Sequence, residues 1–345
     1  MTSPEPIDTV AALDEALSRP TPALIEAMRS IDHDLLILGV GGKMGVSLAC
    51  LARRAFDAAG LKHRKVIGVS RFSSPELVGF LEDAGVETIR CDLLDPDALK
   101  PLPDATHVVY MAARKFGSTG DESTTWAMNT CVPTHVARRY AEAKIVAFST
   151  GNVYPFVSVA SGGATESDPV GPVGEYAQAA LARERLFEHF SRTQGTKVTL
   201  LRLNYAVELR YGVLLDIAQQ VHTRRPVDVH TGFVNVIWQR DANEITLRAF
   251  DLCSSPPTIL NVTGPEILSV RDIAERFAAK FKTEPIFEGT EAPTALLNNA
   301  ANCHERFGKP TVAVDQVIDW VAHWVSIGGA THGKPTGFER RDGKF

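Results

Sequence analysis

The chain has 345 residues, 44% of them hydrophobic and 22% charged, which excludes a disordered protein and allows one large domain or two unequal ones. Its net charge of −5, without long basic runs, gives no reason to expect nucleic acid or a membrane surface as partner. No apolar stretch approaches the roughly 18 residues of a membrane span, and the first residues lack the charged start and apolar core of a signal peptide, so we expect a cytoplasmic protein. The five cysteines are far apart and form no C-x-x-C pair, so neither a disulfide framework nor a metal site is predicted.

Residues 8–31 show helical periodicity that Pro20 and Pro22 interrupt, which predicts two short helices. We interpret residues 1–32 as a structural N-terminal extension. An apolar run from residue 34 to residue 38 then predicts the first strand, and it ends abruptly in glycines.

Strands and helices alternate from this point up to residue 203. The predicted strands cover 34–38, 65–69, 87–91, 107–111, 145–149 and 197–203, and the longest helices cover 126–143 and 176–191. Such alternation is typical of an α/β fold with a Rossmann-like, doubly wound parallel sheet whose two faces are covered by helices.

After residue 204 the alternation loosens, which predicts a smaller, mainly C-terminal substrate domain. One more strand is expected at 258–262, with helices at 212–221, 271–281 and 315–325, the last with Asp315 as its N-cap. The expected division is 33–205 plus about 233–263 for the Rossmann-like sheet domain, and about 206–232 plus 264–345 for the smaller domain and tail. The glycine-rich, charged tail from residue 328 could fold over a site, but a frayed terminus is the favoured interpretation.

The glycines after the first strand predict a site for the pyrophosphate of a dinucleotide. The segment Gly39-Val-Gly41-Gly42-Lys43-Met44-Gly45 is followed at once by a helical pattern, so it forms a turn from a strand into a helix. Glycine permits the tight turn and the close approach of backbone to ligand, and the helix N-terminus offers free N–H groups to phosphate.

The end of the second strand favours NADP over NAD. An Asp or Glu at this place binds the ribose 2′-hydroxyl of NAD, whereas this chain has Ser70 and Arg71 and no carboxylate up to Ser74. Arg71 could pair with the 2′-phosphate, and Lys43 could add charge from the other side. In the alternative interpretation Arg71 only stacks on the adenine, which leaves NAD open.

Further segments resemble the extended short-chain dehydrogenase/reductase family, also called NAD(P)-dependent epimerases/dehydratases, over residues 33–325. The resemblance rests on the glycine turn, on Asp92-Leu93 as the adenine-contacting pair, on the turn Met111-Ala112-Ala113, on Asn129, and on Thr150 and Tyr176 at the positions of the catalytic Ser/Thr and Tyr. It implies hydride transfer at a hydroxyl or keto carbon, and a homodimer formed through the two long helices.

One catalytic residue of the family is missing, because Ala180 stands where its Tyr-x-x-x-Lys motif has lysine. That lysine holds the nicotinamide ribose and lowers the pKa of the tyrosine, and an unassisted phenol, whose pKa is near ~10, is a poor base. Three interpretations stay open. Lys115 or Arg183 could supply the cation, Tyr176 could act only as an acid or hydrogen-bond donor, or the protein could bind dinucleotide without turning it over.

The substrate region also departs from the family's pattern. Asn204 fits, but the proline turn expected after Tyr205 is absent. Trp238 and Gln239 could line a polar pocket in which the indole stacks on a sugar ring. Alternatively, Trp238 belongs to the core and Asp241 caps a helix.

The sequence therefore predicts an NAD(P)-dependent oxidoreductase or epimerase/dehydratase that prefers NADP and acts on a sugar-like or polyhydroxylated small molecule. The competing hypothesis, which Ala180 motivates, is a non-catalytic NAD(P)-binding sensor or scaffold.

Overall fold

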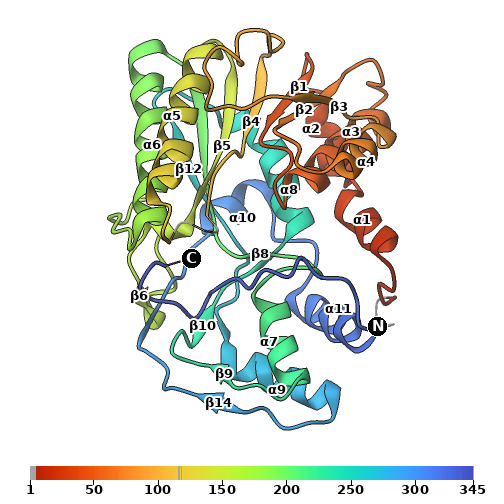
Figure 1. The fold of residues 1–345 in the computed structure, drawn as a ribbon, viewed down its shortest axis with the longest axis vertical. Coiled ribbons are helices and arrows are strands. Elements are labelled where there is room, and N and C mark those ends of the chain that lie inside the picture. Colours follow the sequence, from red (N-terminus) through yellow and green to blue (C-terminus); the bar gives the residue numbers. More distant parts are fainter. Residues whose placement is uncertain (1–4, 116, 118, 345) are drawn as a thin grey trace.

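Seven parallel strands form the central sheet of the molecule, in the order β12-β7-β5-β4-β1-β2-β3 (Figure 1). A computed structural model describes residues 5–115, 117 and 119–344; the first four residues, on which the expected lack of a signal peptide partly rests, lie outside it. The strands are β1 (Leu35–Leu38), β2 (Val66–Ser70), β3 (Glu87–Arg90), β4 (His107–Tyr110), β5 (Lys144–Thr150), β7 (Lys197–Leu203) and β12 (Thr258–Val262). The predicted doubly wound parallel sheet is confirmed.

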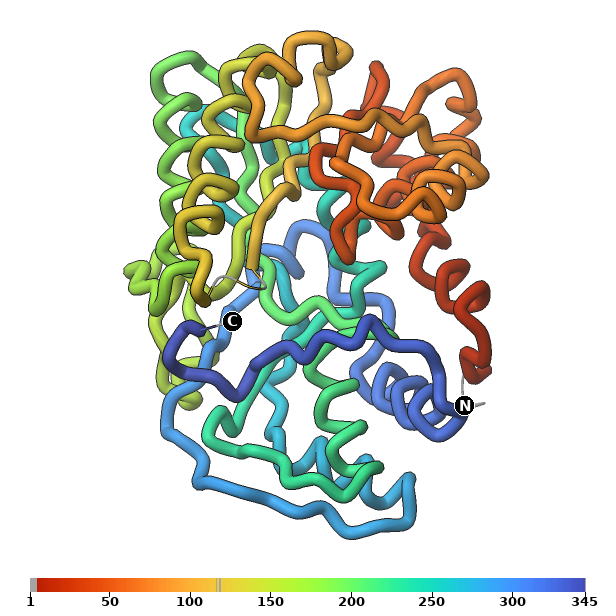
Figure 2. Tube along the Cα trace, in the orientation of Figure 1, coloured from red at the N-terminus to blue at the C-terminus, as the bar shows by residue number. Residues whose placement is uncertain are grey.

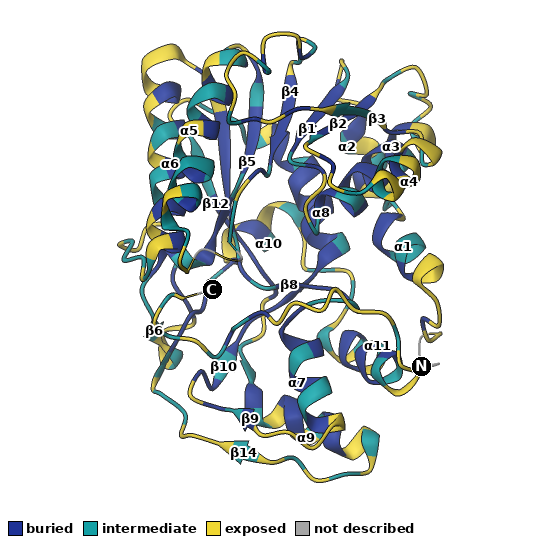
Figure 3. Cartoon of the chain, in the orientation of Figure 1, coloured by how far each residue is buried: buried dark blue, intermediate teal, exposed yellow. Residues whose placement is uncertain are grey.

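Helices cover both faces of the sheet because its strands are apolar on both sides. In β1, Leu36 and Leu38 pack toward one face, whereas Leu35 and Ile37 pack toward the other. The first face is covered by α5 (Glu122–Arg139) and α6 (Glu175–Gln194). The second is covered by α2 (Pro22–Met28), α3 (Gly45–Ala58), α4 (Pro75–Asp83), α8 (Gln239–Arg248) and α10 (Ala301–Phe307). Figure 3 shows the buried strands between these two helical layers.

A second apolar core lies below the sheet in the C-terminal part of the chain. It joins α7 (Val213–His222), α9 (Val270–Phe281) and α11 (Val314–Ser326). Short two-residue strands surround it or link it to the sheet domain: β6 (Val157–Ser158), β8 (Ala206–Val207), β9 (Val227–Asp228), β10 (Phe233–Val234), β11 (Ile237–Trp238), β13 (Leu268–Ser269), β14 (Phe287–Glu288) and β15 (Thr294–Ala295). Short 3-10 helices cover Gly151–Val153, Val159–Ser161 and Ala249–Leu252.

The two helices predicted in the N-terminal extension are present, and each begins at a threonine cap. The Thr9 side chain accepts a hydrogen bond from the backbone of Ala12 at the start of α1 (Val10–Ser18), and Thr21 does the same for Leu24 in α2. The expected caps of two later helices are wrong. Ala313 caps α11 and Trp238 caps α8, so Asp315 and Asp241 lie inside the first turns. Asp241 instead accepts hydrogen bonds from Thr311.

The C-terminal tail is not frayed, which corrects the expectation from sequence. Residues 328–344 run along the boundary between the sheet domain and the second core (Figure 2). Thr336 donates two hydrogen bonds to Asp216 of α7, and Arg341 donates two to Thr294. No local sequence pattern predicts these contacts, because they join residues about 50 to 120 positions apart.

Candidate active site

The glycine turn brings three backbone segments closer together than any side chain would allow. Gly39 has φ +94°, and a Cβ there would lie 2.6 Å from the backbone nitrogen of Ala112 after β4. A Cβ on Gly45 would lie 2.3 Å from the carbonyl oxygen of Val40. The turn therefore packs tightly against β4 and begins α3 directly, which leaves the free N–H groups of the first turn of α3 at the edge of the sheet.

A cavity of about 1070 Å³ extends from this turn to the ends of β4 and β5. It lies where ligands bind in such sheets, beside the point between β1 and β4 at which the strand order reverses. Gly41, Met111, Thr150 and Tyr176 all contribute to its wall. The cavity therefore joins the predicted pyrophosphate turn to the predicted catalytic pair.

Thr150 and Tyr176 come from different elements and face the same cavity. Thr150 ends β5, and its hydroxyl accepts a hydrogen bond from the backbone of Asn152 at 3.2 Å. Tyr176 lies in the first turn of α6, and the Lys115 ammonium lies 5.9 Å from the centre of its ring. Burial lowers the pKa of Lys115 to about 8, against the opposing effect of the Asp216 carboxylate. Lys115 is thus a cation beside the tyrosine.

Arg183 is the second cation of this part of the cavity, and its side chain is 2% exposed. Its guanidinium donates to the side-chain oxygen of Asn129 at 2.7 Å, and within the described chain no carboxylate forms an ion pair with it. Asn129 in turn donates to the carbonyl oxygens of Thr125 and Arg114. One buried asparagine therefore orients Arg183 and also holds the backbone next to Lys115.

Ala180 is completely buried and packs with Val153 and Tyr154. It is not part of the cavity wall, whereas Tyr176 and Arg183 on the same helix are. The structure therefore has apolar packing at Ala180, and the basic side chains that reach the cavity come from other positions.

A buried ion pair, Glu184–Arg202, connects α6 to β7 close to Thr150. Arg202 donates to both carboxylate oxygens of Glu184, at 3.0 and 2.7 Å, and both side chains are almost inaccessible. Ser149, next to Thr150, donates to the same carboxylate, and Arg202 also donates to the Tyr154 hydroxyl at 2.7 Å. This network fixes the end of β5 relative to the helix that carries Tyr176.

Lys43 does not point toward Ser70 or Arg71, in contrast to the expectation from sequence. Its ammonium donates to the carbonyl oxygen of Ala206 in β8 at 2.9 Å and lies 4.2 Å from the centre of the Tyr211 ring. Burial lowers the pKa of Lys43 to about 7, although the charge of Glu208 raises it in part, while Lys115 and Arg210 lower it further. The Lys43 ammonium thus faces β8 and the turn that follows it.

The residues that are predicted to bind the adenosine half of the dinucleotide lie on the other side of the glycine turn. A Cβ on Gly41 would lie 2.6 Å from the Ser70 hydroxyl, so the turn contacts the end of β2. Arg71 is exposed, and Arg90 of β3 donates to its carbonyl oxygen at 2.8 Å, which brings a second guanidinium that the sequence analysis missed. Asp92 follows β3 and accepts from the backbone of Leu94, and Leu93 is buried against the sheet.

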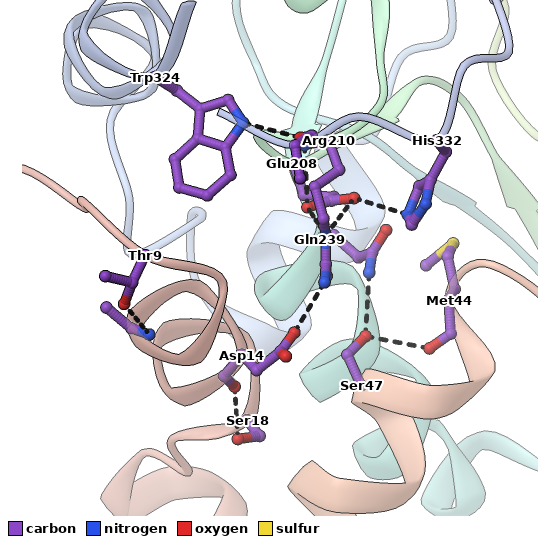
Figure 4. Close-up of polar contacts among 12 residues, drawn as sticks. Thr9, Asp14, Ser18, Met44, Ser47, Glu208, Arg210, Gln239, Trp324 and His332 are labelled. Atoms are coloured by element: carbon purple, nitrogen blue, oxygen red, sulfur yellow. Dashed lines mark hydrogen bonds and ion pairs between the residues drawn. The ribbon is translucent and has the colours of Figure 1, made fainter. Parts of the chain in front are cut away.

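Two of the four predicted substrate residues line the cavity, and two do not. Asn204 and Tyr205 are in its wall, and Tyr205 has an unusual positive φ of 41°. The proposed indole platform is wrong, because Trp238 is 2% exposed, belongs to the second core and packs on Trp320. Gln239 is also buried, and it donates to the Ser47 hydroxyl of α3 (Figure 4).

The chain ends contribute site residues that the sequence analysis did not identify. Asp14 of α1 and His332 of the tail both line the cavity, and both contact the turn after β8 (Figure 4). Arg210 pairs with Asp14 at 2.9 Å and with Glu208 at 3.0 Å, and His332 lies 3.3 Å from Glu208. Burial would raise the pKa of Glu208, but the hydrogen bond from His332 and the charges of Arg210 and Lys43 hold it below its usual value.

Residues 35–225, more than half of the chain, match the NAD dependent epimerase/dehydratase family. The chain belongs to this family. The glycine turn, Thr150 and Tyr176 all lie within the matched part of this epimerase/dehydratase family member. No curated protein matches its sequence.

Solved structures of sugar-nucleotide enzymes have the same fold. UDP-glucose 4-epimerase from Thermus thermophilus, solved with NAD, is 21% identical, with a TM-score of 0.69 over 86% of this chain and 100% of that one. UDP-glucose 4-epimerase from Thermotoga maritima, with UDP-glucose, is 15% identical, with a TM-score of 0.68 over 85% and 98%. DesIV, a dTDP-glucose 4,6-dehydratase from Streptomyces venezuelae with NAD and TYD bound, is 16% identical, with a TM-score of 0.71 over 85% and 97%.

The residues of this chain fit a nicotinamide dinucleotide. Gly41 and Gly42 are exposed at the cavity, and a side chain on Gly41 would fill the space beside Ser70. In the part of the chain that the structure describes, no helix is long and apolar enough to cross a membrane, and no cluster of metal-ligating side chains is found.

Proposed function

We propose that this family member is an NADP-preferring oxidoreductase or epimerase/dehydratase that acts on a hydroxyl or keto carbon of a polyhydroxylated small molecule. The observation that carries the proposal is the single cavity that joins the glycine turn to Thr150, Tyr176 and Arg183. A pyrophosphate at the turn and a reacting carbon beside Thr150 and Tyr176 would then lie in one cavity.

Each side chain of the site has its own role in the proposed reaction. A bound dinucleotide would supply the acceptor for the hydride that an alcohol carbon loses when it becomes a carbonyl, and the hydroxyl proton would pass to the protein. Tyr176 takes up that proton, and Thr150 holds the same oxygen by a hydrogen bond. Lys115, beside the tyrosine, stabilises its phenolate.

Arg183 takes over the positioning role of the family's lysine in this proposal. It lies two turns after Tyr176 on the same helix and reaches the cavity with a buried guanidinium that Asn129 orients. A guanidinium carries several donors in a fixed plane, so it can hold ribose hydroxyls while it keeps its bond to Asn129.

The preference for NADP is supported by the charge at the end of β2. Arg71 and Arg90 lie together there, and Ser70 adds a hydroxyl. Two guanidinium groups near a 2′-phosphate favour NADP, because charge-assisted hydrogen bonds to phosphate are about twice as strong as neutral ones. The unpaired 2′-hydroxyl of NAD offers no such contact.

The test is a fluorescence titration of the purified protein with NADPH and with NADH. We expect NADPH to bind more tightly, and Arg71→Ala to weaken NADPH about tenfold or more while it leaves NADH nearly unchanged. Arg29→Ala, at an exposed arginine of α2, is the matched control. If neither dinucleotide binds, and denaturing extraction releases none that came bound, the proposal is wrong.

A non-catalytic dinucleotide sensor is the second candidate, and the buried Ala180 favours it. Lys115→Met separates the two candidates once a turnover assay exists. The variant abolishes turnover if the protein is an enzyme that uses this cation, whereas a sensor has no turnover to lose and keeps its dinucleotide affinity.

A further inference from the structure

Positive charge gathers at the substrate end of the cavity, beyond the part that the dinucleotide would occupy. Lys43 and Lys115 come from the glycine turn and from the segment after β4, and both line the cavity. The tail adds His332 and Lys334 to the same wall. The two lysines are close enough for the charge of Lys115 to lower the pKa of Lys43.

Three carboxylates in this region have partners of their own within the protein. Glu208 contacts Arg210 and His332, Asp14 pairs with Arg210, and Asp216 accepts both hydrogen bonds of Thr336. Within the described residues, no carboxylate forms an ion pair with the Lys43 ammonium, which donates to a neutral carbonyl. A partly buried ammonium with only neutral direct partners is stabilised when an anion binds beside it.

Lys43 faces the substrate and not the cofactor's phosphates, because its side chain leaves the glycine turn in the direction of β8. Its neighbours there, Ala206 and Tyr211, belong to the segment after β7. Lys115 lines the same cavity, and its ammonium lies 5.9 Å from the centre of the Tyr176 ring. An anionic group between the two lysines would therefore lie next to the oxygen on which Tyr176 acts.

The tail forms part of the wall of the main cavity. His332, Lys334 and Thr336 line it, and the tail is held at Asp216 and Thr294. Lys115, Asn152 and Thr336 line this cavity and also border a separate one of about 30 Å³, which has room for about one or two water molecules. The main cavity of about 1070 Å³ is near the ~1,000 Å³ upper end for one drug-sized ligand, and it must also hold the dinucleotide.

We propose that the substrate is a small polyhydroxylated anion, a sugar acid or sugar phosphate, whose anionic group binds between Lys43 and Lys115 under the tail. The inference rests on the proposed function, because it assigns the substrate of the same site. It departs from the sugar nucleotides in the titles of the structurally similar enzymes, because the cavity of about 1070 Å³ has to hold the dinucleotide as well as the substrate.

The experiment measures ligand binding by calorimetry to the full-length protein saturated with NADP⁺. The probes are D-gluconate, D-glucose 6-phosphate, D-glucose and UDP-glucose, so that carboxylate, phosphate, neutral sugar and sugar nucleotide are compared directly. We expect at least one of the two small anions to bind about tenfold or more tightly than D-glucose and UDP-glucose. Whichever binds identifies the anionic group as a carboxylate or a phosphate.

Lys43→Met tests the residue that carries the inference, with Lys62→Met, at an exposed position after α3, as the matched loss of charge. We expect Lys43→Met to weaken the small anion about tenfold and to leave NADP⁺ affinity within about threefold. The inference is overturned if UDP-glucose binds most tightly, if neither anion exceeds D-glucose, or if Lys43→Met loses NADP⁺ affinity instead. Failure of the wild-type protein to bind any dinucleotide is a different result, and it removes the proposed function first.

Discussion

At the scale of single residues, the site brings Thr150 and Tyr176 together with three cations. Lys43, Lys115 and Arg183 line the same cavity, whereas Ala180 packs in an apolar cluster. The chemistry of the site therefore depends on how these three charges are held.

Tyr176→Phe removes the proton carrier and keeps the ring. We expect kcat to fall by about 10²- to 10⁴-fold, the usual contribution of a positioned acid or base, while NADPH affinity changes little. Steady-state kinetics and the fluorescence titration measure the two quantities. Tyr140→Phe, at a tyrosine that bonds Pro103 at the far end of α5, is the control. Equal losses in both variants would argue against the role of Tyr176.

The pKa of Lys43 links its protonation to the stability of the fold. Its folded pKa of about 7 lies below the ordinary 10.5, so between these values the unfolded chain binds more protons than the folded chain. The free energy of unfolding should therefore rise as pH increases through this window. Urea unfolding at several pH values should show a smaller rise for Lys43→Met than for the wild type. An identical pH profile in the two proteins would contradict the assignment.

At the scale of elements, helix α6 positions the site, because Tyr176 and Arg183 point from it into the cavity and Glu184 contacts β7. Parallel strands β5 and β7 end beside it, and the Glu184–Arg202 pair fixes this junction without contact with solvent. The side chains on one helix thus serve both the site and its support.

Arg202→Met leaves the Glu184 carboxylate buried without its guanidinium partner. We expect the free energy of unfolding to fall by about 3–5 kcal/mol, measured by urea denaturation. The double variant Glu184→Leu/Arg202→Met should recover most of this loss, since it removes the buried charge together with its partner. A single variant as stable as the wild type would show that the pair is not closed to water.

At the scale of the whole molecule, the two chain ends contribute to the wall of the site. The extension α1 and the tail both line the cavity, and both contact the turn that carries Glu208 and Arg210 (Figure 4). About 15% of this chain is not covered by the similar structures, although they are covered almost completely.

Truncation after Ala330 removes the tail's contacts with the cleft and keeps the hydrogen bond between Trp324 and Ala330. We expect NADPH to dissociate several-fold faster, because the cleft loses its cover, while the fold stays intact. Stopped-flow fluorescence measures the rate, and circular dichroism checks the fold. Lys344→Met, near the end of the same tail, should leave the rate unchanged.

The homodimer predicted through α5 and α6 is a further proposal at this scale. The two helices pack side by side on one face of the sheet (Figure 1), and Ala182 is a small, half-buried residue of α6. We expect sedimentation to show a dimer, and Ala182→Glu to shift it to the monomer without loss of helix content, because the variant places unpaired charge in the contact. A monomeric wild-type protein would contradict the proposal.

The sequence by itself determined the parallel sheet, the glycine turn and the positions of Thr150 and Tyr176. These features depend on short segments, in which apolar strands, glycines and helix periods follow one another within a few residues. The prediction that Ala180 replaces the family's lysine also rests on local spacing along one helix, and it stays a prediction.

Only the tertiary structure decided the direction of Lys43, the burial of Trp238 and the course of the tail. Lys43 bonds Ala206, Trp238 packs on Trp320, and Thr336 bonds Asp216, so each outcome depends on a partner about 80 to 160 residues away in the sequence. Local pattern carries no information about such partners, because hydrogen bonds and packing between distant segments form only when the whole chain is folded.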